Sequence, residues 1–157
     1  IVASTYRIST RTHPRGIARV PTAATRAKLR VAAQASLSHQ HAARGTSICV
    51  VHSVDSYLRK LNRQFSGVDV TTDVLAFPAN GQDGHLGDVI ISAERAVQSA
   101  VRGGHETSGE LQLLTVHGAL HLLGHDHGTP EERVRMWQAQ AEIMAQLGIS
   151  DLAPTAS

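Results

Sequence analysis

Hydrophobic positions along the chain follow two different spacings, which together predict a mixture of strands and helices. Short apolar runs rich in β-branched residues predict strands at residues 2–9, 47–52, 72–77 and 86–92. Apolar residues three or four positions apart predict helices, caps included, at residues 21–43, 53–65, 92–102, 107–124 and 129–148. Because these elements lack a regular βαβ alternation, the predicted fold class is α+β, a small mixed β-sheet packed against several α-helices.

Individual residues are expected to begin these helices or to pack in the core. Thr22, Ser53 and Ser92 are predicted N-caps, and TSGE at residues 107–110 and TPEE at 129–132 are predicted capping boxes. Two helices are expected to bury an apolar stripe, made of Val54, Leu58, Leu61 and Phe65 in one and of Val134, Trp137, Ala141 and Met144 in the other. Trp137 is interpreted as a packing anchor rather than a base-stacking residue.

The length of 157 residues predicts one domain over residues 1–152, followed by a disordered tail at 153–157. Hydrophobic residues make up 41% of the chain and aromatic residues only 3%, so the core is expected to be aliphatic. No apolar run reaches membrane-spanning length, and no membrane partner is expected. Cys49 lies in an apolar run and is interpreted as a small buried hydrophobe; a single cysteine suits a reducing cytoplasm.

Charge is distributed unevenly between the first third of the chain and the rest. Residues 1–54 carry eight basic side chains and no acidic one, whereas the remainder is net acidic. Such a basic segment suits a polyanionic partner such as RNA, by neutralisation of phosphates. Two other interpretations remain open: a solvated helix face, and the remnant of an organellar targeting segment, because acid-free ends rich in Arg, Ser and Thr have that composition.

The sequence HGALHLLGHDH at residues 117–127 predicts a metal site. His117 and His121 are four residues apart and share one face of a helix. Gly124 can end that helix in a left-handed turn, which brings His127 back towards the same point. Three neutral protein ligands with an open fourth position are typical of a catalytic zinc ion rather than a structural one. His125 is interpreted as a partly exposed residue that is not a ligand.

Zinc is chosen over nickel, copper or iron from availability and geometry, since imidazole binds all four. Zinc proteases with this histidine spacing place a glutamate, the general base, directly after the first histidine. Gly118 occupies that position here and cannot accept a proton. Its expected role is to let backbone or substrate approach the helix closely. The residues alone therefore predict a zinc hydrolase.

This histidine motif resembles the signature of the bacterial YbeY family, single-strand-specific endoribonucleases of rRNA maturation with a three-histidine zinc site. Leu61-Asn62 with TDVLAFP at residues 72–78, and LGDVI at residues 86–90, resemble two further family segments. The resemblance spans about residues 47–147. It implies one Zn²⁺ held by His117, His121 and His127, at the end of the metal-binding helix of an α+β fold.

The same resemblance implies a function in late processing of the small-subunit rRNA 3′ end and in ribosome quality control. The expected partners are single-stranded RNA, rRNA and ribosomal particles, and no DNA is expected. The implied location is the cytoplasm, or an organelle if the basic N-terminal segment is a targeting remnant.

One position departs from the family pattern. The family usually has an arginine, thought to assist the phosphate chemistry, where this chain has Ser66. A serine cannot supply a bidentate cation to a phosphate. Arg63 could substitute only if the loop turns it inward, so the basic contact comes from elsewhere or catalysis is weakened.

Zinc bound to three imidazoles can lower the pKa of its water to about 7 and polarise a phosphoryl oxygen. Either water or the ribose 2′-hydroxyl could then attack a phosphodiester, and the residues do not separate these routes. Asp126 is the candidate acid/base residue, although it could instead orient a ligand imidazole. Asp73 is expected to pin a turn and Asp88 to line a cleft between the metal site and the loop at residues 65–72.

Two alternatives to a ribonuclease remain open. One is a zinc metallopeptidase that lacks the usual glutamate and takes its base from Asp126 or Glu110. The other is a zinc-stabilised RNA- or ribosome-binding module whose catalysis is impaired by Ser66. The missing glutamate argues against the first, and Ser66 is the best argument for the second.

Overall fold

The computed structural model describes residues 5–15, 21–67, 70, 72–149 and 152. The predicted tail at 153–157 and the first residues of the predicted strand at 2–9 therefore lie outside the described residues. In chain order the elements are β1 (Arg7–Thr12), α1 (Ala23–His39), β2 (Ser47–Ser53), α2 (Asp55–Ser66), β3 (Val74–Pro78), a short 3-10 helix η1 (Gln82–Gly84), β4 (His85–Ser92), α3 (Ala93–Gly103), α4 (Thr107–Leu122) and α5 (Pro130–Gln146).

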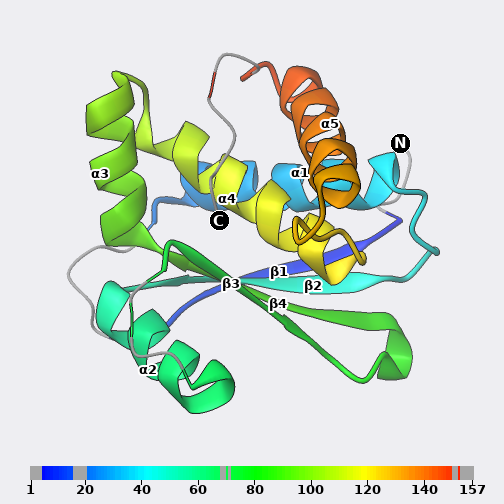
Figure 1. Ribbon diagram of the computed structural model, residues 1–157, viewed down its shortest axis with the longest axis horizontal. Helices are drawn as coiled ribbons and strands as arrows, with labels where there is room; N and C mark the ends of the chain where they lie inside the picture. Colours follow the sequence, from blue (N-terminus) through cyan, green and yellow to red (C-terminus); the bar gives the residue numbers. More distant parts are fainter. Residues whose placement is uncertain (1–4, 16–20, 68–69, 71, 150–151, 153–157) are drawn as a thin grey trace.

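The four strands form one mixed sheet in the order β1-β2-β4-β3. β1, β2 and β4 run parallel, and β3 pairs antiparallel with β4, as expected for two strands joined by a short loop. β3 is therefore one edge of the sheet and β1 is the other. With helices packed on the sheet, the arrangement confirms the predicted α+β class (Figure 1).

Helices cover the two faces of the sheet unequally. α4 lies across one face, with α1 beside it and α5 on its outer side, while α2 lies on the opposite face (Figure 1). Successive side chains of each strand point to opposite faces of the sheet, as the pleat of a strand requires. Val50 and Val89 pack with Leu114 of α4, whereas Val51 and Ile90 pack with Leu58 of α2.

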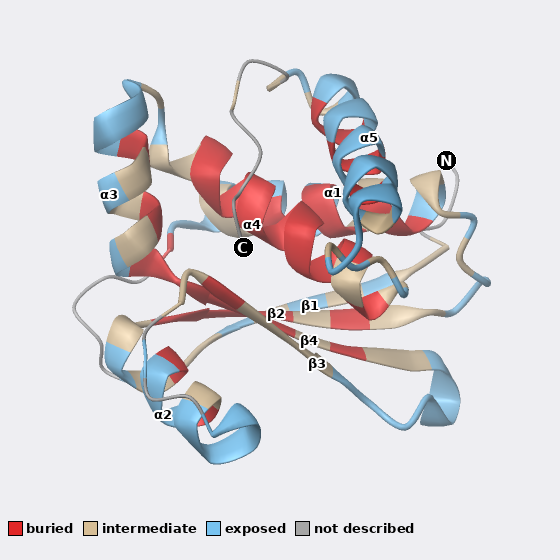
Figure 2. Ribbon diagram, viewed as in Figure 1, coloured by how far each residue is buried: buried red, intermediate tan, exposed pale blue. Residues whose placement is uncertain are grey.

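α4 is the central helix of the fold. Every residue from Gly109 to Leu120 is buried, and Leu122 is buried as well (Figure 2). A helix that is apolar on all sides belongs in an interior, and α4 contacts α1, α3, α5, β3 and β4. The described core is aliphatic, as predicted, because its buried hydrophobic residues are Ala, Val, Leu, Ile and Met. Among the described residues, no helix has the length and hydropathy needed to cross a membrane.

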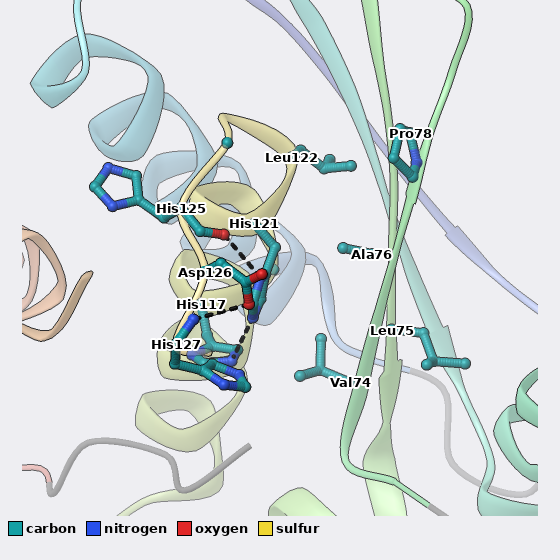
Figure 3. Close-up of a pocket in the computed structure, with 12 residues that line it drawn as sticks. Val74, Leu75, Ala76, Pro78, His117, His121, Leu122, His125, Asp126 and His127 are labelled. Atoms are coloured by element: carbon teal, nitrogen blue, oxygen red, sulfur yellow. Dashed lines mark hydrogen bonds between the residues drawn. The ribbon is translucent and has the colours of Figure 1, made fainter. Parts of the chain in front are cut away.

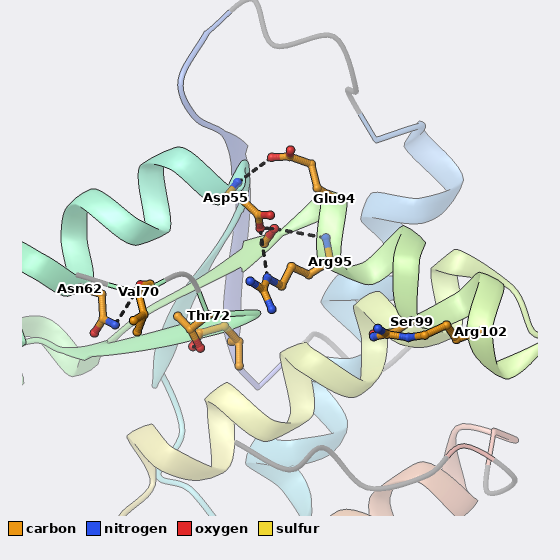
Figure 4. Close-up of polar contacts among 10 residues, drawn as sticks. Asp55, Asn62, Val70, Thr72, Glu94, Arg95, Ser99 and Arg102 are labelled. Atoms are coloured by element: carbon orange, nitrogen blue, oxygen red, sulfur yellow. Dashed lines mark hydrogen bonds and ion pairs between the residues drawn. The ribbon is translucent and has the colours of Figure 1, made fainter. Parts of the chain in front are cut away.

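The start of α2 differs from the prediction. Ser53 belongs to β2 and does not cap the helix, whose N-cap is Val54 without a side-chain bond. The backbone N–H of Asp55 instead donates to Glu94 Oε1 at 2.6 Å. The Asp55 carboxylate accepts a hydrogen bond from Ser92 and lies 3.5 Å from Arg95 Nε (Figure 4). The cap is thus supplied by α3, which no local pattern around residue 53 could indicate.

The two predicted capping boxes have different outcomes. In TPEE, Thr129 is confirmed as the N-cap: its Oγ1 accepts from the N–H of Glu132 at 3.1 Å. TSGE is wrong, because Thr107 is already inside α4, whose N-cap is Glu106. Glu110 does not reach back to the helix start as the motif requires; its Oε1 lies 2.6 Å from Nε2 of His105. The predicted caps at Thr22 and Ser92 are confirmed.

Four residues expected in apolar stripes are exposed: Phe65, Val134, Trp137 and Ala141. Trp137 is 40% exposed, with the Arg133 guanidinium 5.9 Å from its ring, and so is not a packing anchor. Val134 is 62% and Phe65 65% exposed. α5 packs against both α1 and α4, which selects a different stripe: Met136, Ala139, Gln140, Ile143 and Met144. Phe65 stands in the last turn of α2, edge-on to Phe77 of the edge strand β3.

Gly118 lies where α4 packs closely against β3 and β4. A Cβ atom at this position would lie 2.5 Å from Val89 Cγ1 and 3.3 Å from Val74 Cγ2. Gly118→Ala is therefore expected to lower the free energy of unfolding by about 1–3 kcal/mol through overpacking, measured by urea denaturation.

Gly128→Ala is the matched control, since nothing lies within 4 Å of a Cβ there and its φ is not positive. It is expected to change the free energy of unfolding by less than about 0.5 kcal/mol. Equal effects of the two substitutions would contradict the close contact between α4 and β4.

Candidate metal centre

The end of α4 is a glycine-terminated turn that reverses the chain. Gly124 has φ +96°, the N–H of Gly124 donates to His121 O at 3.1 Å, and the N–H of His125 donates to Leu120 O at 2.9 Å. This pair of bonds is the Schellman motif, in which glycine accepts the left-handed conformation without strain. The helix therefore ends where the sequence predicted, and the chain turns back over its last turn.

The turn brings together the three histidines predicted as ligands. His117, His121 and His127 each offer one ring nitrogen within 4.8 Å of the others. The Nε2 atoms of His117 and His121 are 3.1 Å apart, close to the separation of about 3.3 Å expected for two nitrogens on a tetrahedral zinc ion. Figure 3 shows the three imidazoles converging below the chain reversal.

The outer ring nitrogens of two of these histidines have partners that fix their protonation. His121 Nδ1 lies 3.0 Å from the carbonyl oxygen of His125, which can only accept, so Nδ1 carries the proton. His117 Nδ1 lies 3.1 Å from Oε1 of Gln140, also an acceptor. In a neutral imidazole with Nδ1 protonated, Nε2 has a lone pair. Two such lone pairs facing each other at 3.1 Å fit a cation between them.

Burial favours the neutral form of His121, which is the form in which an imidazole binds a metal ion. Burial, and next the neighbouring His127, lower the pKa of His121, while the His125 carbonyl and Asp126 oppose this shift. A lowered pKa leaves His121 neutral at neutral pH, as a metal ligand must be. His117 is 1% exposed, at the base of the site.

A pocket of about 510 Å³ opens beside the histidines. One wall is the end of α4 with the turn that follows, and the other is β3, through Val74, Leu75, Ala76 and Pro78 (Figure 3). The cleft was expected to face the loop at residues 65–72, but the described wall is the edge strand itself. Residues 68, 69 and 71 of that loop lie outside the described residues.

The acidic candidates have different positions relative to this pocket. Asp126 lies at its rim, and Oδ1 accepts from the N–H of His127 at 2.8 Å. Asp88 does not line it; the side chain lies 3.2 Å from His85 Nε2, and its strand alternation puts it on the α2 face. The backbone carbonyl of Asp73 accepts from Ser92 N–H at 2.9 Å. Glu110 is paired with His105 and is absent from the pocket lining among the described residues.

His125, Ser66 and Arg63 lie outside the cluster of His117, His121 and His127. The ring of His125 points away from the other three (Figure 3), and burial, Arg135 and His39 lower its pKa. Ser66 Oγ donates to the carbonyl oxygen of Asn62 at 2.6 Å, so it is turned back onto its own helix. Arg63 is exposed in the last turn of α2 and is not among the described residues that line the pocket.

Gln140 is a site residue that the sequence reasoning missed. It is 2% exposed, lies in the buried stripe of α5 and contacts His117 across the helix interface. A glutamine between Met136 and Ile143, at positions that are otherwise apolar, was a signal in the sequence. A buried polar side chain needs a partner, but only the packing of α5 on α4 identifies that partner as His117.

Gln140→Leu is expected to weaken zinc binding by about 10- to 100-fold, because the acceptor that orients His117 is lost. Affinity can be measured by competition with a chromogenic chelator. Gln140→Glu retains an acceptor and should keep most of the affinity. Gln146→Leu, an exposed glutamine at the end of the same helix, is the control, and equal affinities in Gln140→Leu and wild type would contradict this role.

Comparison with known proteins finds the same family that the histidine motif resembles. The family described as Endoribonuclease YbeY matches residues 12–148. An Endoribonuclease YbeY of Chloroflexus aurantiacus is 41% identical over 129 residues, which cover 75% of this chain and 84% of that protein. An Endoribonuclease YbeY of Carboxydothermus hydrogenoformans is 43% identical over 116 residues, which cover 73% of this chain and 80% of that protein. The solution structure of TM1509 from Thermotoga maritima superposes with a TM-score of 0.56 at 20% identity, covering 96% of this chain and 99% of that one, which shows a shared fold.

Proposed function

The chain belongs to the YbeY endoribonuclease family, and on that premise we propose that it is a zinc-dependent endoribonuclease that cleaves single-stranded RNA during rRNA maturation. The observation that carries the metal dependence is the pair of Nε2 lone pairs facing each other at 3.1 Å, with His127 beside them at an open pocket. The donor set of three neutral imidazoles suits zinc.

The residues of the chain divide the chemistry between them. His117, His121 and His127 would hold the ion, which when bound supplies Lewis-acid polarisation of a phosphoryl oxygen and activation of water. The pocket gives access from the β3 side for an unpaired strand. The exposed Asp126 carboxylate at the rim would accept or return a proton.

The basic first third supports an RNA partner, but not at the pocket itself. Arg7 and Arg11 are exposed on β1, which is the edge of the sheet opposite to β3. Arg30 and Arg44 are exposed as well. These cations would neutralise phosphates distant from the scissile bond, which is the sequence-independent part of RNA binding. We therefore propose a large, structured substrate such as rRNA in ribosomal particles, with a single-stranded segment in the pocket.

The alternatives differ in their support. A peptidase that uses Glu110 as its base is disfavoured, since that carboxylate pairs with His105 outside the pocket lining. A binding module without catalysis is favoured by one observation: Ser66 donates to Asn62, and no arginine is among the described residues of the pocket wall.

Zinc-loaded protein is expected to cleave a fluorescent single-stranded RNA, and His121→Ala to lose at least about a hundredfold in rate, because the metal contributes several kcal/mol. His85→Ala is the matched control, since it removes a histidine outside the pocket lining. Binding of RNA without cleavage by the zinc-loaded protein would favour the binding module, and cleavage unaffected by His121→Ala would contradict the metal mechanism.

Asp126→Asn separates the two roles considered for this carboxylate. The asparagine can still accept from the N–H of His127, so zinc affinity should remain within about threefold of wild type. If Asp126 transfers a proton, the rate of cleavage at saturating zinc should fall by about 10²-fold or more. A variant with normal cleavage would show that Asp126 only orients the turn.

A further inference from the structure

Four side chains, from the turn after α4, the end of α1 and the outer face of α5, form a continuous hydrogen-bonded chain beside the candidate metal centre. His125 Nε2 lies 2.7 Å from Gln40 Oε1, Gln40 Nε2 lies 2.9 Å from His39 Nδ1, and His39 Nε2 lies 2.6 Å from Glu142 Oε2. The chain starts in the turn after α4, passes through the end of α1 and finishes at the exposed face of α5.

The positions of the Gln40 amide atoms give the bonds of this chain one consistent direction. The amide oxygen of Gln40 can only accept, so His125 Nε2 carries a proton. The amide nitrogen of Gln40 can only donate, so His39 Nδ1 accepts and His39 Nε2 donates to Glu142. That last bond lowers the pKa of the Glu142 carboxyl and keeps it an acceptor. No donor faces a donor along the chain.

Gln40 is presented by a rigid part of the fold. It is the C-cap of α1, and its backbone N–H donates to Ser36 O at 3.2 Å. α1 is anchored by Leu29, Ala33 and Leu37, which are buried in the main core with residues of α4. His125 contacts the metal site through its backbone, because its carbonyl oxygen accepts from His121 Nδ1 at 3.0 Å.

We propose that Gln40 is a positioning residue for the metal centre: it holds the ring of His125 and thereby fixes the carbonyl that orients His121. Asp126, which follows His125, is exposed, and without the bond to Gln40 the peptide after His125 would be free to rotate. His39 and Glu142 fix which end of the Gln40 amide faces His125. Glu142 accepts from His39 Nε2, so His39 Nδ1 accepts from the Gln40 amide nitrogen and the amide oxygen faces His125. This inference rests on the proposed zinc site.

The test compares Gln40→Leu, Gln40→Asn and Gln40→Glu with wild type. Gln40→Leu removes the acceptor, and Gln40→Asn keeps the amide but shortens its reach. Both are expected to weaken binding of Zn²⁺ by about three- to tenfold. This effect is smaller than the loss of affinity, about 10- to 100-fold, expected when a residue that directly contacts a metal ligand is removed. Gln40→Glu keeps an acceptor for His125 and should bind Zn²⁺ within about twofold of wild type.

The visible absorption bands of bound Co²⁺ give a readout that a general loss of stability would not move. They should shift in Gln40→Leu and Gln40→Asn and remain unchanged in Gln40→Glu. Gln98→Leu, an exposed glutamine of α3, is the control, and circular dichroism of the metal-free proteins verifies folding. Wild-type affinity and spectrum in folded Gln40→Leu would overturn the inference, whereas failure of the wild type to bind Zn²⁺ or Co²⁺ would instead overturn the proposed function.

Discussion

The burial of α4 is the constraint on which the rest of this structure depends. The helix is enclosed by the sheet on one side and by α1, α3 and α5 on the others, so any polar group it carries must find a partner inside the protein. Its C-terminal end alone reaches the pocket, because Gly124 reverses the chain there. The candidate metal centre thus lies where the buried helix ends at an open pocket.

The helices around α4 supply the polar partners that its buried residues require. Gln140 of α5 contacts His117, and the backbone carbonyl of Lys28 in α1 accepts from Gln112 Nε2 at 3.1 Å. Gln40, at the end of α1, reaches His125 in the turn. Packing and metal-site geometry are therefore coupled, since shifting α1 or α5 would displace the groups that orient the imidazoles.

The order of the strands separates two parts of the proposed function. β3 forms the pocket wall at one edge of the sheet, and the arginines of β1 lie at the other edge. Chemistry at the histidines and charge neutralisation along the RNA backbone would use different regions of the surface. This separation suits a substrate much larger than the few nucleotides that a pocket of about 510 Å³ can hold.

The sequence by itself determined the features that depend on near neighbours in the chain. The spacing of His117 and His121 and the glycine at 124 predicted the histidine cluster, because helical geometry and the left-handed turn are local properties. Only the tertiary structure decided which stripe of α5 is buried, that Glu94 caps α2, and that Gln140 contacts His117 and Gln40 contacts His125. Those outcomes depend on contacts between residues distant in sequence, which arise only when the helices pack together.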